Sequence, residues 1–129
     1  MFIDLKDGSI SIDDGFVLGK ILSFKDFKKS PYYKEQSKDR VFTLDGKHEI
    51  GQHIFYIGLY FKEGYLYQIF LELDDESIKG FEELPKLKAL HDEFLHSIDI
   101  KGEKEFIWGT VGSYYNERSG DSDIVVTYK

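Results

Sequence analysis

The chain has 129 residues, 41% of them hydrophobic, which is enough for one folded domain with a sizeable core. It has no cysteine, which excludes disulfides, a thiol nucleophile and a cysteine-based zinc site. The net charge of −7 argues against a nucleic-acid partner, because an acidic protein repels a phosphate backbone. The start has no signal-peptide pattern and no long apolar run. We therefore expect a cytoplasmic, bacterial-type protein with a single domain over residues 1–129 and no contact with a membrane.

The first part of the chain predicts tight turns and a short helix. Asp7-Gly8 and Asp13-Asp14-Gly15 both stand between short alternating apolar runs, which is a hairpin signal. Ser23 and Asp26 have the spacing of a capping box, which predicts one or two helical turns over about 24–29.

One stretch of the chain, residues 20–40, is rich in lysine although the whole protein is acidic. The spacing of these lysines is typical of a solvent-exposed helix and loop. A docking patch for an acidic partner is the alternative, because a local cluster of one charge can steer a partner of the opposite charge.

The strongest pattern in the sequence covers residues 53–73, where apolar residues alternate on both sides of a turn at 62–64. Both faces of these two strands carry large residues. We therefore expect this hairpin to lie centrally in a sheet, with one face on the core and the other partly covered. Gly58 in mid-strand either leaves room for a bulky neighbour or marks a bulge. Asp45-Gly46, just before it, predicts another hairpin turn.

After residue 80 the hydrophobic period changes to three and four residues, which predicts an amphipathic helix over about 83–97. Glu82 and Glu83 favour its start, and Pro85 fits its first turn. Two further strands follow in "FIWGTVGSYYN" and "DIVVTY". The expected fold is α+β: an antiparallel sheet of about six to eight strands, one long helix packed on a face and one short N-terminal helix.

The four histidines do not have the spacing of a metal site. His91 and His96 are five residues apart, which rotates them about 140° from each other on a helix instead of placing both on one side. His91 lies on the apolar stripe, where a buried and hydrogen-bonded histidine is the usual finding. His48 and His53 flank a turn, which is a weak metal pattern. We expect no metal site and no cofactor.

Catalytic motifs are also absent from the sequence. There is no G-x-S-x-G elbow around any serine, and "GTVGSYYN" lacks the lysine and following helix of a phosphate loop. The 24 acidic residues leave a glycosidase-like carboxylate pair open, but their number alone does not indicate one. The sequence therefore favours a protein that is not an enzyme.

The segment "RSGDSD", residues 118–123, combines residue types found in active sites and in turns. A calcium loop would need more oxygen ligands and a following bidentate glutamate. Gly120 and the nearby Asn116 are typical turn residues. We expect a hairpin loop between two strands.

Tyrosine is the unusual excess in this chain, with nine residues. Buried hydroxyls need hydrogen-bond partners, so aromatic packing in the core does not easily accommodate them all, although such packing is the simplest alternative. Exposed tyrosines beside acidic residues are typical of a protein-recognition face. The candidate binding residues are Tyr56, Tyr60, Tyr114, Tyr115, Asp74, Asp75 and Glu76.

Three segments carry a resemblance to a known group of proteins: "DGSISIDDGFVL" with "SFKDFKKSPYY" near the start, "LHDEFL" in the helix, and "WGTVGSYYNERSGDSDIVVTY" at the end. Together they resemble small uncharacterised bacterial proteins, some of which are thought to be immunity factors encoded beside polymorphic toxins. Asn116 stands where that pattern has Asp, which affects turn chemistry alone. The resemblance transfers no functional residue.

Taken together, these observations predict a non-enzymatic protein-binding domain, an immunity-type inhibitor of a bacterial toxin. Its partner would be a protein, and a basic toxin domain suits the acidic tyrosine-bearing surface. Two alternatives remain open at this point: a small hydrolase or metal-dependent enzyme with a site near the long helix, and a structural or oligomeric domain. A pocket holding two or more of His91, Asp92, Glu93 and His96 would favour the enzyme.

Overall fold

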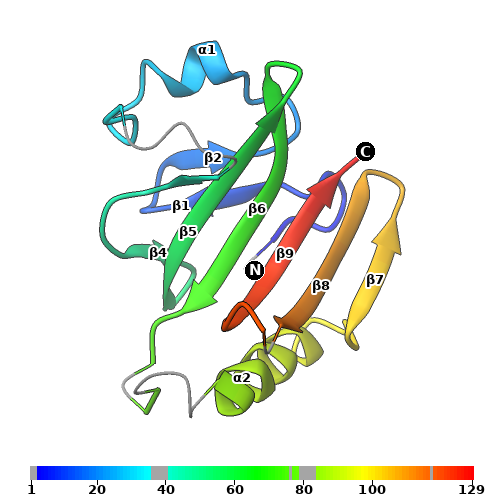
Figure 1. The fold of residues 1–129 in the computed structure, drawn as a ribbon. Coiled ribbons are helices and arrows are strands. Elements are labelled where there is room, and N and C mark those ends of the chain that lie inside the picture. Colours follow the sequence, from blue (N-terminus) through cyan, green and yellow to red (C-terminus); the bar gives the residue numbers. More distant parts are fainter. Residues whose placement is uncertain (1–2, 36–40, 76, 79–83, 117) are drawn as a thin grey trace.

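The computed structural model describes residues 3–35, 41–75, 77–78, 84–116 and 118–129. Within these residues the chain forms nine strands and two helices (Figure 1). Their bounds are β1 Ile10–Ile12, β2 Phe16–Leu18, α1 Phe24–Phe27, β3 Phe42–Thr43, β4 His48–Ile50, β5 His53–Lys62, β6 Tyr65–Leu73, α2 Leu84–His96, β7 Glu103–Phe106, β8 Gly109–Asn116 and β9 Asp121–Tyr128.

Seven of the described strands form one antiparallel sheet in the order β3-β5-β6-β9-β8-β7, and β4 pairs with β5 beside β3. β1 and β2 form a separate two-stranded sheet. The predicted α+β class and antiparallel sheet are confirmed. The first hairpin differs from the rest because it does not join the main sheet but packs against it.

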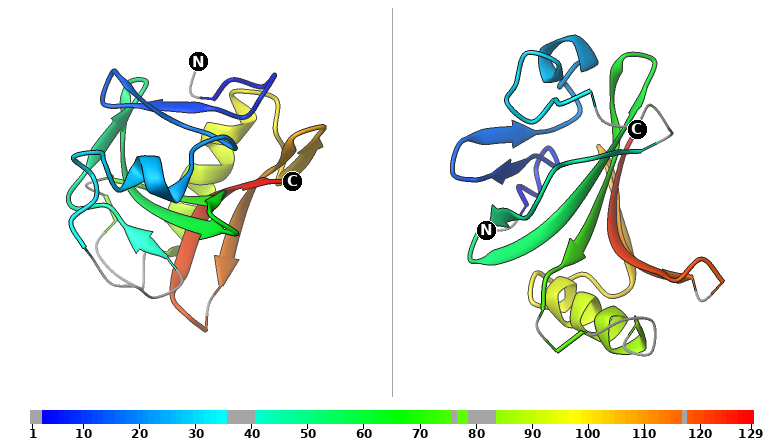
Figure 2. Two further views of the ribbon diagram at one scale, coloured as in Figure 1. Left: turned by 90° about the horizontal axis from the view of Figure 1, so that it is seen from above. Right: turned by 60° about the vertical axis from the view of Figure 1, so that its left-hand side comes forward.

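The two faces of the main sheet have different surroundings. β1, β2 and α1 lie on one side of it, and α2 lies at the end of the sheet near the turn between β8 and β9 (Figure 2). Side chains on this covered side form the core, and α2 packs on β6, β8 and β9. The long helix therefore covers one end of the face, and the β1–β2 hairpin covers much of the rest. No element of the described residues covers the opposite side.

The central hairpin follows its predicted alternation and lies inside the sheet as expected, but no element of the described residues covers its second face. Phe55, Ile57 and Leu59 of β5 are buried on the covered side, as the period-two alternation requires. A bulge lies between Tyr60 and Phe61, two residues beyond Gly58. Gly58 itself provides space: a Cβ at this position would lie 2.7 Å from Cγ1 of Val41. The first of the two explanations for this glycine is therefore the correct one.

α1 is shorter than predicted, and α2 ends one residue before its predicted end. α1 ends at Phe27, and Oγ of Ser23 caps it by accepting a hydrogen bond from the Asp26 N–H at 3.0 Å. α2 is described from Leu84 onward; the predicted start, with Glu82 and Glu83, falls outside the described residues. The buried residues of α2 are Leu84, Leu87, His91 and Leu95, which keep the predicted helical spacing.

The predicted hairpin at Asp7-Gly8 is wrong, because the described chain has a turn there and no strand before it. This turn is closed by hydrogen bonds from the Asp4 N–H to the Ser9 carbonyl and from the Gly8 N–H to the Asp4 carbonyl. Trp108 Nε1–H and the Tyr128 hydroxyl donate to carbonyls of residues 5 and 8, which ties the N-terminal segment to the last strands. These long-range contacts replace the local strand pairing.

Candidate protein-binding face of the sheet

The uncovered side of the main sheet is the candidate functional surface, and we call it the open face. Side chains alternate along each strand, so the pairing register decides which residues share this side. Its central members are Tyr56, Gly58 and Tyr60 of β5, Gln68, Phe70 and Glu72 of β6, Asp121, Asp123, Val125 and Thr127 of β9, and Thr110, Gly112 and Tyr114 of β8.

A groove of about 380 Å³ crosses the open face, and we call it the carboxylate groove. Its lining residues are Val41, Thr43, Tyr56, Ile57, Gly58, Phe70, Glu72, Asp121 and Asp123. A second hollow of about 440 Å³ adjoins it and shares Val41 and Phe70 with it. Apolar and aromatic side chains thus lie beside three carboxylates.

The three carboxylates come from two strands that are adjacent in the sheet. Leu71 pairs with Ile124, so Glu72 and Asp123 occupy the next position along each strand. Burial, followed by the charges of Glu72 and Asp121, raises the pKa of Asp123 to about 7. The pKa of Glu72 is also raised, first by burial and then by Asp121 and Asp74. Within the described part of the chain, none of the three forms a salt bridge.

Tyr114 lies directly opposite Asp123 in the β8–β9 pairing and is 42% exposed. Its ring lies over Gly112, where a Cβ would come within 2.6 Å of the tyrosine hydroxyl. The hydroxyl donates a hydrogen bond to Oε2 of Glu103 at 2.7 Å. Burial and this contact raise the pKa of Tyr114 to about 12, so it stays a neutral hydrogen-bond donor.

Tyr56 lies opposite Glu72 in the β5–β6 pairing and is 38% exposed. The Lys47 ammonium lies 6.0 Å from the centre of its ring and 3.1 Å from Oδ2 of Asp74. This lysine therefore interacts with both Tyr56 and Asp74 at the rim, whereas no described residue forms a salt bridge with the three groove carboxylates.

The structure brings together part of the candidate set. Tyr56, Tyr60 and Tyr114 share the open face, and Asp74 lies at its rim. Tyr115 follows Tyr114 directly and so points to the opposite side of β8. Asp75 accepts hydrogen bonds from the N–H and the hydroxyl of Ser77. Glu76 lies outside the described residues.

The sequence prediction missed the acidic residues at the centre of the open face: Glu72, Asp121 and Asp123. The predicted loop at 118–123 is correct for its first half, where Gly120 has φ +72° and Oδ1 of Asn116 accepts from the N–H groups of residues 118 and 119. Asp121 and Asp123, however, already belong to β9. Their alternation with buried Ser122 and Ile124 was the available signal.

His91 is fully buried and has a partner on each ring nitrogen. The Leu73 N–H donates to its Nε2 at 3.0 Å, so Nδ1 carries the proton and faces Oγ of Ser122 at 3.2 Å. Burial lowers the pKa of His91 to about 4. Glu93 and His96 are exposed on α2, so these side chains do not converge with His91 on a common pocket. This arrangement gives no support to an enzyme site near the long helix.

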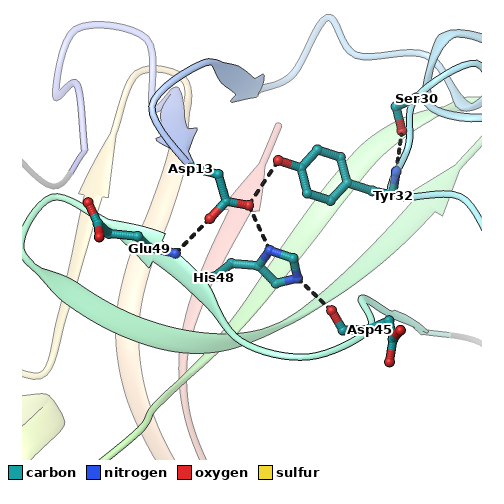
Figure 3. Close-up of polar contacts among 6 residues, drawn as sticks. All are labelled: Asp13, Ser30, Tyr32, Asp45, His48 and Glu49. Carbon is teal, nitrogen blue, oxygen red and sulfur yellow. Dashed lines mark hydrogen bonds and ion pairs between the residues drawn. The ribbon is translucent and has the colours of Figure 1, made fainter.

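His48 takes part in a different polar cluster, on the covered side of the sheet (Figure 3). Its Nδ1 lies 2.7 Å from Oδ2 of Asp13, and its Nε2 lies 2.9 Å from the carbonyl of Asp45. The Tyr32 hydroxyl and the Glu49 N–H also donate to the Asp13 carboxylate. In a catalytic Asp–His pair the second nitrogen would face a nucleophile. Here it faces a main-chain carbonyl, so the cluster joins the β1–β2 turn to β4.

The described residues contain no group of three or more His, Cys, Asp or Glu side chains arranged to hold a metal ion. His53, one of the candidate ligands, packs edge-on against the ring of Phe94 at 4.8 Å. Among the helices described here, neither is long and apolar enough to cross a membrane.

Comparison with known proteins gives a likeness of fold. No protein-family model matches the sequence, and no curated protein is similar to it by sequence. The structure is similar to a chain in the solved structure of Rhs1-CT in complex with cognate immunity protein RhsI1, with a TM-score of 0.58 and 14% sequence identity. The match covers 98% of this chain and 86% of that one. The resemblance to immunity-type proteins is therefore confirmed at the level of fold: the chain has an immunity-protein-like fold.

Proposed function

We propose that this chain is a non-enzymatic protein-binding domain: an immunity-type inhibitor that binds and masks a bacterial toxin domain in the cytoplasm. The observation that carries the proposal is the fold likeness to a chain from a complex of a toxin C-terminal domain with its immunity protein, over 98% of this chain. A fold alone does not specify a function, so the proposal also needs a suitable surface.

The open face supplies such a surface. Tyr56, Tyr60 and Tyr114 provide rigid aromatic contact area with a polar tip, which is characteristic of residues at the centre of protein interfaces. The acidic groove between them suits a basic toxin domain. Asp74 would meet the partner at the rim, whereas Tyr115 and Asp75 would do so where the interface extends beyond the open face.

Co-expression with the product of the neighbouring gene tests the proposal. We expect the chain to restore growth of cells that produce the toxin and to co-purify with it as a stable complex. A double substitution on the open face, Tyr56→Ala with Tyr114→Ala, should abolish both. The matched control is Tyr65→Ala, an exposed tyrosine beside the β5–β6 turn. Absence of both complex formation and growth rescue with the unaltered chain would contradict the proposal.

The same purification distinguishes the oligomeric alternative. A structural domain that self-associates would elute as a multiple of 15.1 kDa without a second protein. An immunity-type inhibitor would elute together with the toxin.

A further inference from the structure

The carboxylate groove has the size and lining of a binding site for one long side chain. Its apolar part includes Val41 and the ring of Phe70, which the adjoining hollow shares. Its other end carries the carboxylates of Glu72, Asp121 and Asp123. A side chain with a hydrocarbon stem and a charged head can place each part against matching surface.

The charge within the groove is not compensated by the described residues. Asp123 faces Glu72 on β6, Asp121 on its own strand and the neutral Tyr114 on β8. The cation at the rim, Lys47, is engaged by Asp74. Like charges held close together without a cation raise each other's free energy, and a cationic ligand would relieve that repulsion.

Arginine fits the groove better than lysine does. Its planar guanidinium has five N–H donors and can bind more than one carboxylate at once. It also stacks on aromatic rings, and the groove offers those of Tyr56 and Phe70. The ammonium of lysine is a compact, strongly hydrated point charge. It binds several carboxylates and stacks on aromatic rings less well than a guanidinium does.

We propose that the carboxylate groove receives an arginine side chain from the protein partner. This inference rests on the proposed function and specifies the partner chemistry at the same surface. Where Asp123 carries a proton, that proton leaves for bulk water when the arginine binds, and the guanidinium replaces it as the neutralising charge. Binding of the partner is therefore stronger at higher pH.

The expected pH effect follows from the ionisation of Asp123. With a pKa of about 7, its carboxyl group is ionised in roughly one tenth of the molecules at pH 6 and in roughly nine tenths at pH 8. The guanidinium stays fully charged over this range. The affinity for an arginine ligand should therefore rise about 10-fold from pH 6 to pH 8.

The test is an NMR titration of the full ¹⁵N-labelled chain with the peptide acetyl-Gly-Arg-Gly-amide at pH 6 and at pH 8. We expect the amide shifts to change around Gly58, Phe70 and Asp123, with a dissociation constant about 10-fold lower at pH 8. Asp123→Asn should weaken binding and reduce this 10-fold ratio to near 1. Glu72→Gln, as a second groove variant, should also weaken it. Glu93→Gln, on the exposed side of α2, should leave affinity and ratio unchanged.

Three outcomes would contradict arginine binding in the groove. They are amide shift changes on another surface, a ratio of the dissociation constants at pH 6 and pH 8 near 1 in the unaltered chain, or a ratio that Asp123→Asn does not alter. Toxin protection separates this inference from the proposed function. If the chain protects cells but the peptide does not bind the groove, the proposed function stands and the proposal of an arginine site fails. If the peptide binds as expected but no toxin is inhibited, the proposal of an arginine site is supported and the proposed function fails.

Discussion

Two aspartates on opposite sides of the main sheet show how differently one fold uses the same side chain. Asp13, in the β1–β2 turn, accepts hydrogen bonds from Tyr32, His48 and the Glu49 N–H. Burial by itself would raise its pKa, but these donors outweigh burial and lower it. Asp123, on the open face, lies near the carboxylates of Glu72 and Asp121, and burial together with these charges raises its pKa to about 7.

The difference separates a structural carboxylate from one that is available for binding. A carboxylate that receives several donors is stabilised as an anion and holds its surroundings together. A carboxylate that is partly buried without donors destabilises the isolated protein and can recover that free energy when a cation arrives. The experiments below test whether this contrast holds, beginning with the largest expected effect.

Asp13→Asn should reduce the free energy of unfolding by about 3 kcal/mol, because a neutral amide loses the charge-assisted hydrogen bonds from Tyr32 and His48. The asparagine keeps the size of the side chain and tolerates the left-handed backbone of this position, φ +49°. Urea denaturation at pH 7 measures the change. Asp14→Asn, the adjacent turn residue with φ +60°, is the matched control and should change stability little. Equal effects would show that the turn, and not the donors, is responsible.

Asp123→Asn should have the opposite sign and increase the free energy of unfolding by about 2 kcal/mol at pH 8. The folded-state pKa lies above the unfolded value, so the folded protein binds the proton more tightly and loses stability as the pH rises from about 4 to 7. The gain from the substitution should therefore be small at pH 4.5. Thermal unfolding across this pH range measures it. A destabilised variant at pH 8 would show that Asp123 has a structural role after all.

Tyr114→Ala and Tyr115→Ala form a pair of adjacent substitutions on opposite sides of β8. If the open face binds the partner, Tyr114→Ala should weaken the complex by about 1.5 kcal/mol, which is typical of an interface tyrosine. Tyr115→Ala should change affinity by less than about 0.5 kcal/mol. Calorimetry with the purified partner distinguishes them. The reverse order of effects would place the interface on the other side of the sheet.

His91→Gln should cost about 1 kcal/mol at pH 7, because the glutamine oxygen can still accept from the Leu73 N–H while the packing changes. The unaltered chain should lose stability as the pH falls from 6.5 towards 4. Over this range His91 binds a proton in the unfolded chain but stays neutral in the folded protein, where it is buried. Glutamine does not titrate, so the variant should lack this part of the acid sensitivity. An unchanged pH profile would show that other groups cause it.

Local patterns predicted much of the fold but only part of the binding surface. The alternation through β5 and β6 and the change of period into α2 reflect packing within single elements, so both could be read directly from the sequence. The first turn was misassigned because Asp7-Gly8 obeys hairpin chemistry, while contacts with Trp108 and Tyr128 decide its conformation. Those two residues lie more than one hundred positions away, where a local pattern has no information.

The sequence by itself determined where the central strands and the long helix form, because propensity, capping and hydrophobic period act over a few residues. It also placed Tyr56 and Tyr60 on one side of β5. Only the tertiary structure decided that Glu72 and Asp123 become neighbours, because strand order in a sheet depends on long-range pairing. The same sheet places Tyr114 on the open face and Tyr115 on the opposite side of β8. It also leaves the acidic side uncovered by any described element.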